Sequence, residues 1–308
     1  MKTSLLALAT LVAAASTTAC GGEFDPSSRI STLRVIAVRA DVPYAHPGET
    51  VNLEALAHDP LKRPLTYGWS FCVNPIESTP QGCLAQIGID AQRTGTPPVF
   101  TVGVDVTKFV VTVPNDLLTR LPVGARPNAM IGVIAVACPG TLTLTPSGGL
   151  PYTCTDAGGR VLGLHDAITG MKRVFIRSKD RNENPTIARV TFDGADWPET
   201  ETKTIGACEF ASFDLNDCDG EKHIIGAFGP ANVIESGTDE YGNVFTEQVV
   251  AQYYSTAGLF ENGTRISAKP ETAFGGRSDD HGKTITLWLV LRDDRGGVSW
   301  VTRTIAVK

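Results

Sequence analysis

The sequence lacks the motifs by which several classes of enzyme are recognised. It contains no G-x-S-x-G nucleophile elbow, no H-E-x-x-H pattern, no P-loop and no dinucleotide-binding fingerprint. Its seven cysteines include no C-x-x-C pair, and no histidine spacing matches them, which argues against a zinc site. The five histidines are scattered near expected turns and strand ends, where an imidazole is usually solvated or capping. These absences point away from catalysis and from a bound cofactor.

Charge and long apolar runs are also scarce. Only 19% of the 308 residues are charged, and the formal net charge of −6 gives no electrostatic reason to bind nucleic acid. After residue 20 no apolar run approaches the ~20 residues that a membrane-spanning helix needs. The hydrophobic content of 42% is nevertheless sufficient for one large or two ordinary domains.

The N-terminus has the composition of an export signal. Lys2 supplies a positive charge, residues 5–15 form an apolar stretch too short to span a bilayer, and small residues then continue to Cys20. We therefore predict a signal peptide over residues 1–19, followed by a flexible tether over residues 20–29.

The end of this signal, Thr17-Thr18-Ala19-Cys20, resembles the lipobox of bacterial lipoproteins. In that family the cysteine is diacylated, with palmitate among the chains, and cleavage leaves it as the first residue. The resemblance implies lipidation of Cys20 and an anchor in the cell envelope, most often in the outer membrane on its periplasmic or surface face. The alternative is ordinary cleavage after Ala15 or Ala19, which would leave a free thiol.

Lipidation of Cys20 would also explain the odd number of cysteines, because six would remain to pair with one another. They form neighbouring couples along the chain, so we predict the disulfides Cys72–Cys83, Cys138–Cys154 and Cys208–Cys218. Such bonds persist in the oxidising envelope. Each closes a short loop and is worth at most ~3 kcal/mol in the chain-entropy model.

Alternating apolar and polar residues predict β-strands throughout residues 30–179. The apolar run 130–137 (MIGVIAVA) has the pattern of a central strand. The glycine-rich stretch 138–170 is an insertion pinned by the second predicted disulfide, and we expect it to be the contact surface of this domain. No long amphipathic helix is predicted after residue 20.

Residues 33–71 resemble the opening strands of the immunoglobulin-like and PKD-type domains of bacterial surface proteins. The similarity is carried by Gly48, Val51, Leu53, Ala55, Asp59, Pro60, Tyr67 and Trp69. The resemblance implies a β-sandwich with Trp69 in its core. It does not extend to the inter-sheet disulfide of antibody domains, because the second strand has no cysteine.

The polar segment 178–185 (SKDRNENP) predicts a domain boundary. Strand patterns resume after it, and residues 285–307 form the clearest hairpin in the chain, with its turn at 293–297. Residues 282–294 also resemble the last strands of a PKD-like domain. The expected fold is therefore all-β, with two tandem immunoglobulin-like β-sandwiches over residues 30–179 and 180–308.

Two sets of residues are candidates for binding. In the loop 214–221 (DLNDCDGE), Asp217 and Asp219 fall at ligand positions of a calcium loop, which makes them a weak metal candidate. The alternative is an acidic loop closed by a disulfide. Trp288 and Trp300 lie opposite the main apolar stripes of their strands, where they either pair across the hairpin or form an exposed aromatic platform.

We expect a lipid-anchored envelope protein with a non-catalytic binding, adhesion or structural role, held to the membrane by its N-terminal lipid. Its partner would be a protein or a polysaccharide, not nucleic acid. The alternative is a surface hydrolase or a carbohydrate-binding protein that uses loops on the same scaffold. A paired carboxylate site for glycoside hydrolysis is not favoured by any spacing in the sequence.

Overall fold

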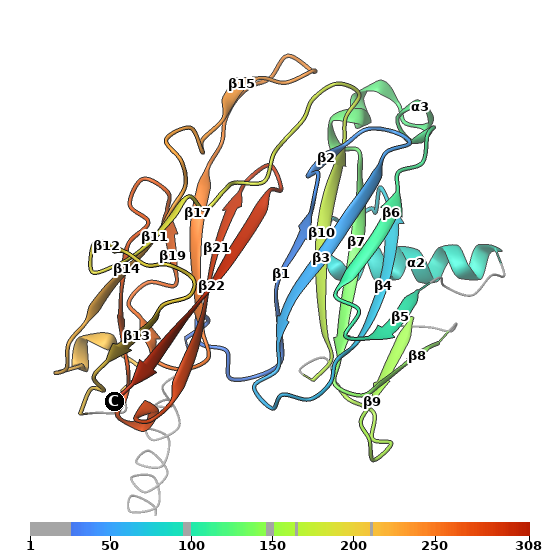
Figure 1. The fold of residues 1–308 in the computed structure, drawn as a ribbon. Coiled ribbons are helices and arrows are strands. Elements are labelled where there is room, and N and C mark those ends of the chain that lie inside the picture. Colours follow the sequence, from blue (N-terminus) through green and yellow to red (C-terminus); the bar gives the residue numbers. More distant parts are fainter. Residues whose placement is uncertain (1–25, 95–99, 146–150, 164–165, 210–211) are drawn as a thin grey trace, which may run out of the picture.

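The structure is a computed structural model that describes residues 26–94, 100–145, 151–163, 166–209 and 212–308. The predicted signal peptide and Cys20 lie outside the described residues. The described chain is built mainly of strands, which form two β-sandwiches (Figure 1). In the described part of the chain no helix is both long and apolar enough to cross a membrane.

The first sandwich packs a sheet of three strands against a sheet of five. The smaller sheet has the order β1 (Arg34–Ala40), β3 (Thr50–His58) and β6 (Lys108–Thr112). The larger sheet has the order β2 (Tyr44–Ala45), β10 (Ile168–Ile176), β7 (Met130–Cys138), β4 (Thr66–Val73) and β5 (Thr101–Val104). Between them lies an apolar core that includes Trp69, which is fully buried as expected, and β7 is buried along its whole length.

The second sandwich repeats this arrangement with two sheets of five strands. One sheet has the order β12 (Ala195–Asp196), β11 (Arg189–Phe192), β14 (His223–Phe228), β20 (Thr272–Gly275) and β18 (Leu259–Phe260). The other has the order β13 (Thr202–Ile205), β22 (Val298–Val307), β21 (Thr284–Asp293), β17 (Val249–Ser255) and β19 (Thr264–Ile266). The small hairpin β15 (Ser236–Thr238) and β16 (Val244–Thr246) stands apart from both.

Both sandwiches have the strand order of an immunoglobulin-like domain. The first, second and fifth strands of the immunoglobulin pattern form one sheet, and the third, sixth and seventh form the other. In each sandwich the last strand also pairs in parallel with a short early strand, β10 with β2 and β22 with β13. The predicted all-β fold of tandem immunoglobulin-like sandwiches therefore agrees with the observed topology.

One element lies outside the predicted strand pattern, the helix α2 (Pro80–Thr94). Pro80 occupies its first position, and the Thr79 hydroxyl caps it by accepting a hydrogen bond from the Gly82 amide over 3.0 Å. Only Cys83, Leu84 and Ile87 are buried, a stripe too short for an amphipathic pattern. Together with the hairpin β8 (Thr141–Leu144) and β9 (Tyr152–Thr155), α2 covers the outer face of the larger sheet.

The three predicted disulfides are present. Cys72–Cys83 ties α2 to β4, Cys138–Cys154 ties the end of β7 to β9, and Cys208–Cys218 closes a loop in the second sandwich. The first two attach the outer layer to the sheet beneath it. The insertion 138–170 is thus partly a packed layer, with Tyr152 and Leu162 buried in it.

The outer layer depends on the first of these bonds. We expect the double variant Cys72→Ala/Cys83→Ala to lose about 3 kcal/mol of unfolding free energy, because the bond closes a loop of 11 residues. Urea denaturation, followed through the unfolding transition of the first sandwich, measures the loss. A loss below about 1 kcal/mol would mean that packing alone holds α2 in place.

The two sandwiches contact each other through a separate apolar cluster. It joins Ile36, Ala37 and Leu56 of the first sandwich to Tyr254, Trp288, Val290, Val298 and Trp300 of the second, with Ile30 between them. The Trp288 ring lies 4.8 Å from that of His58, and the Arg39 guanidinium lies 4.4 Å from the centre of the Trp300 ring. As a result β1 is buried on both of its faces.

The predicted tether ends earlier than residue 29. Ser28 and Ile30 exchange backbone hydrogen bonds with Ser255 at the end of β17, and both residues are buried. The segment that leads into the first sandwich is thus fixed on the second one.

Candidate functional site

The segment between the sandwiches is held by a carboxylate from the second one. Glu240, in the turn between β15 and β16, accepts hydrogen bonds from the amides of Ser178, Lys179 and Asp180 over 3.0, 2.6 and 3.2 Å. Asp180 in return accepts one from the Glu240 amide over 2.7 Å. Burial alone would raise the pKa of Glu240, but the three amides outweigh it and lower the pKa to about 2.

Two further residues connect the sandwiches. Arg295 forms ion pairs with Glu235 and Glu247, and its guanidinium stacks on Tyr44 of the first sandwich at 4.8 Å. Asn184 donates to the Ala40 carbonyl over 2.8 Å and accepts from the Val298 amide over 2.8 Å. With the apolar cluster, these contacts fix the orientation of one sandwich against the other.

A cleft of about 420 Å³ lies between the two sandwiches. Its walls are the edge strand β1 and residues 170–173 of β10, from the first sandwich, and the turn 292–297 from the second. Residues 170–173 have a free strand edge here, because β2 pairs only with Phe175 and Ile176. This volume is in the range typical of sites for small molecules.

Lys172 is the unusual residue of this cleft. It lies on β10 with only 6% of its surface exposed, and its ammonium group donates a hydrogen bond across the cleft to the Gly296 carbonyl. Its pKa is lowered to about 8, mainly by burial and also by the positive charges of Arg292 and Arg173, while Asp293 opposes the shift. Among the described residues no carboxylate lies within 4.0 Å of the Lys172 ammonium.

The carboxylates nearest to Lys172 are engaged elsewhere. Asp293 accepts hydrogen bonds from the amides of Arg295 and Gly297 over 2.9 and 2.6 Å, so it stabilises its own turn. Asp294 accepts from the Gln248 amide over 3.1 Å. Arg292 donates to neutral oxygens, those of the Gln252 side chain and of the Ile36 carbonyl, over 2.6 and 2.7 Å. With three cations and two carboxylates among its lining residues, the cleft holds one excess positive charge.

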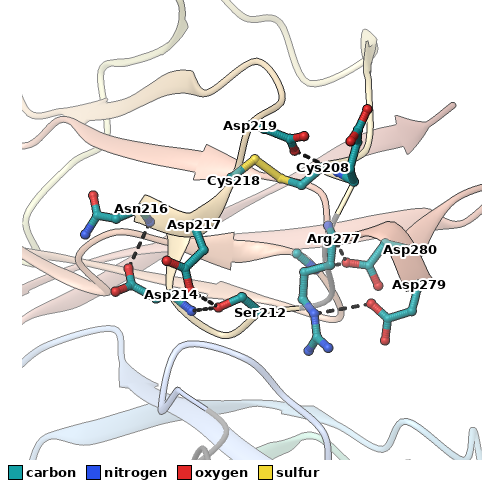
Figure 2. The surroundings of a disulfide bond; sticks show 12 residues. Cys208, Ser212, Asp214, Asn216, Asp217, Cys218, Asp219, Arg277, Asp279 and Asp280 are labelled. Atoms are coloured by element: carbon teal, nitrogen blue, oxygen red, sulfur yellow. Dashed lines mark hydrogen bonds and ion pairs between the residues drawn. A yellow bond between two sulfur atoms is a disulfide. The ribbon is translucent and has the colours of Figure 1, made fainter.

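The structure separates the weak calcium candidates. Figure 2 shows Asp217 and Asp219 on opposite sides of the Cys208–Cys218 disulfide. Asp217 accepts from the Ser212 hydroxyl over 2.7 Å, and Asp219 accepts from the Glu209 amide over 2.8 Å. In the described residues no three His, Cys, Asp or Glu side chains gather as metal ligands would.

Trp288 and Trp300 are not an exposed platform. Trp288 is only 6% exposed, and both rings contact the first sandwich in the apolar cluster described above. They are also not directly opposite in the hairpin, since Trp288 pairs with Thr302 and Trp300 with Val290. The surface that they contact belongs to the same chain.

Two acid–histidine groups lie outside the cleft, in the second sandwich. The His223 imidazole lies 2.8 Å from Asp193, but within the described part of the chain its other nitrogen, Nε2, has no hydrogen-bond partner. Near His281, the Asp280 carboxylate is fully buried and accepts from the amides of Gly258 and Arg277 over 2.7 and 3.1 Å. Among the described residues no nucleophile is hydrogen-bonded to the first pair, and the second group is structural.

Comparisons with known proteins do not assign a family. No protein-family model matches the sequence, and no curated protein matches it. Among solved structures, murine CEACAM1b is similar over 88% of this chain and 100% of that chain, with 8% identity and a TM-score of 0.22. Dimeric latent PorU from Porphyromonas gingivalis is similar over 90% of this chain and 24% of that chain, with 7% identity and a TM-score of 0.21.

A third solved structure contains the M60 catalytic domain with the CBM51-1 and CBM51-2 domains from Clostridium perfringens ZmpB. It covers 92% of this chain and 40% of that chain, with 10% identity and a TM-score of 0.16. TM-scores this low carry no argument about function. The immunoglobulin-like assignment rests on strand order, and the site must be judged on its own geometry.

The buried ammonium should reduce stability in a pH-dependent way. At pH 7, Lys172→Met should raise the unfolding free energy by about 2 kcal/mol. Removing the buried charge gains about 3 kcal/mol, and the loss of its hydrogen bond takes part of that gain away. The folded pKa of about 8 lies below the unfolded value, so wild-type stability rises between pH 8 and 10.5. The difference in unfolding free energy between the wild type and Lys172→Met should therefore become smaller over this pH range. Urea titrations at pH 7 and 9.5 test this, and an equal difference at both values would contradict it.

Glu240 should make the junction sensitive to acid. Its lowered pKa means that its contribution is complete above about pH 4.5 and is lost as pH falls towards 2. Allowing for solvent screening, we expect Glu240→Gln to lower the unfolding free energy by about 1 kcal/mol at pH 6 and to leave it unchanged at pH 2. Thermal denaturation measures the cost, with the exposed Glu261→Gln as control. Equal effects of both variants at pH 6 would exclude a special role for Glu240.

Proposed function

We propose that this chain is a lipid-anchored protein of the bacterial cell envelope with a non-catalytic binding role, and that its ligand enters the cleft between the sandwiches. The observation that carries the proposal is that cleft, which has about 420 Å³ of space and a buried ammonium group within it. The fixed junction supports the same function, because a preformed cleft loses little entropy on binding. The lipobox and PKD-like resemblances favour the envelope.

The position of the cleft suits an anchored binding protein. Only seven residues separate Cys20 from Ser28, so the fold would lie within about 25 Å of its lipid. Ser28 is fixed beside Ser255, whereas the cleft turn follows Asp293, which pairs with Val249 at the other end of β17. These ends are about 20 Å apart, so the cleft is displaced from the membrane attachment.

The alternative, a surface hydrolase or carbohydrate-binding protein, has less support. The Asp193–His223 pair lacks a nucleophile among the described residues, and the two tryptophans that could have stacked on a sugar contact the first sandwich. An adhesion role without a ligand in the cleft would not explain why the charge of Lys172 is buried there.

The anchor can be tested directly. We expect the wild-type protein to fractionate with membranes and Cys20→Ser to be released into the soluble fraction, because the lipid is the proposed attachment. Mass spectrometry of the N-terminal peptide checks for acyl chains on Cys20. A Cys20→Ser protein that stays firmly in the membrane fraction would refute the anchor.

Binding in the cleft can be tested without knowing the ligand. A photo-crosslinking amino acid replaces Arg173 at the rim of the cleft, or Ile89 on the outer surface of α2 as a control. In cells, we expect a specific adduct at position 173 and none at position 89. Equal labelling at both positions, or none at 173, would refute a cleft ligand.

A further inference from the structure

The position of Lys172 in the strand is at odds with its charge. Residues alternate between the two faces of β10, and Lys172 shares the inner face with Val174 and Ile176, which are fully buried in the first core. Lys172 lies next to them where the early strand β2 no longer covers β10. Its ammonium group therefore emerges through the seam between β1 and β10 into the cleft.

The charged groups around this ammonium cancel one another, so the charge of Lys172 itself is left without a counterion. The groups facing it are Arg173 from β10, and Arg292, Asp293 and Asp294 from the turn, while residues 35–38 of β1 supply no charge. Both carboxylates already accept hydrogen bonds from backbone amides. One of the three donors of Lys172 is used by the Gly296 carbonyl, so two remain.

A buried charge without a partner is costly, and natural proteins pair such groups or neutralise them. In the described part of this chain no carboxylate forms an ion pair with Lys172, yet a cavity large enough for an organic ligand lies in front of it. An anionic group entering that cavity would meet the Lys172 ammonium, which lines it. The missing partner is then supplied by the ligand.

We propose that the interdomain cleft binds a carboxylate-bearing ligand, whose carboxylate pairs with the Lys172 ammonium. This rests on the proposed function of the cleft and adds the chemical class of its ligand. The carboxylate can belong to an acidic side chain, to the C-terminus of a peptide or to a small organic acid. The chemistry at Lys172 is the same in each case, and the probes below distinguish these sources.

The second sandwich supplies a matched control. Arg303 also faces inward on the last strand, β22, is 8% exposed, and forms no ion pair with any described residue. It donates to the carbonyls of Trp197 and Thr302 over 2.9 and 2.7 Å and lines a smaller cavity of about 240 Å³. Replacing it disturbs a buried cation without touching the cleft.

The experiment uses the exported chain with Cys20→Ser, so that it can be purified without lipid. Four probes are titrated at pH 7 while the NMR signals of the Arg173 and Gly296 amides are followed. They are acetyl-Ala-Glu-Ala-amide, acetyl-Ala-Ala-Ala with a free C-terminus, glutarate, and the neutral acetyl-Ala-Gln-Ala-amide. At least one acidic probe should bind saturably, the neutral peptide should not, and the strongest acidic probe identifies the source.

Lys172→Met should weaken that binding at least tenfold, whereas Arg303→Met should leave it within twofold. Binding to the wild type should also weaken as pH rises from 7 to 9.5, because Lys172 loses its charge, and Lys172→Met should show no such change. Equal binding of the neutral and acidic peptides, or unchanged binding in Lys172→Met, would overturn the proposal, as would no binding of any acidic probe.

The outcome is separable from that of the proposed function. A specific adduct at position 173 in cells, together with no binding of acidic probes, would exclude a carboxylate-bearing ligand but keep the cleft as a binding site. No adduct at position 173, together with no binding of any probe, would exclude both the carboxylate-bearing ligand and the proposed binding function of the cleft.

Discussion

The contact between β1 and the β21–β22 hairpin is the constraint on which the rest of the architecture depends. It buries Ile36 and Ala37 on a strand face that a single immunoglobulin-like domain would expose, and it covers Trp288 in return. Because apolar burial has no direction of its own, this contact alone would allow the sandwiches to slide. The hydrogen bonds of Asn184 and Glu240 supply the direction and set the angle between the sandwiches.

A fixed angle explains why the cleft can exist. Where β2 stops short, β10 and β1 leave a seam in the first sandwich, and the turn of the β21–β22 hairpin stands over it without filling it. Asp293 keeps this turn in shape by accepting from two of its amides, so the carboxylate closest to Lys172 is committed to structure. The same residues that build the cleft therefore leave its ammonium group unpaired, and the charge of the site follows from the geometry of the junction.

The sequence predicts local features of this protein better than it predicts contacts between distant segments. A continuous apolar run identified β7, alternation identified the final hairpin, and the spacing of six cysteines identified all three disulfides. The helix α2 was missed because its buried stripe is one turn long and its place is fixed by Cys83, a tertiary constraint. For Trp288 and Trp300, periodicity gave the correct face, opposite the second core, but could not indicate that another domain covers it.

Lys172 shows that a departure from a local rule can itself be a signal. In the stretch Lys172–Ile176 the alternation that places Val174 and Ile176 in the core also places the lysine on the core face, where a strand of this fold calls for an apolar side chain. Arg303 makes the same departure on β22, beside Ile305 and Val307. Each lies on the last strand of its sandwich, just before the point where a short early strand begins to pair with it, so the two exceptions occupy equivalent positions. In the second sandwich the guanidinium donates to carbonyls of the same domain, whereas in the first the ammonium donates, among the described residues, to a carbonyl of the neighbouring sandwich. The first seam has the larger cavity in front of its cation, about 420 Å³ against about 240 Å³, and this larger space suits a ligand site.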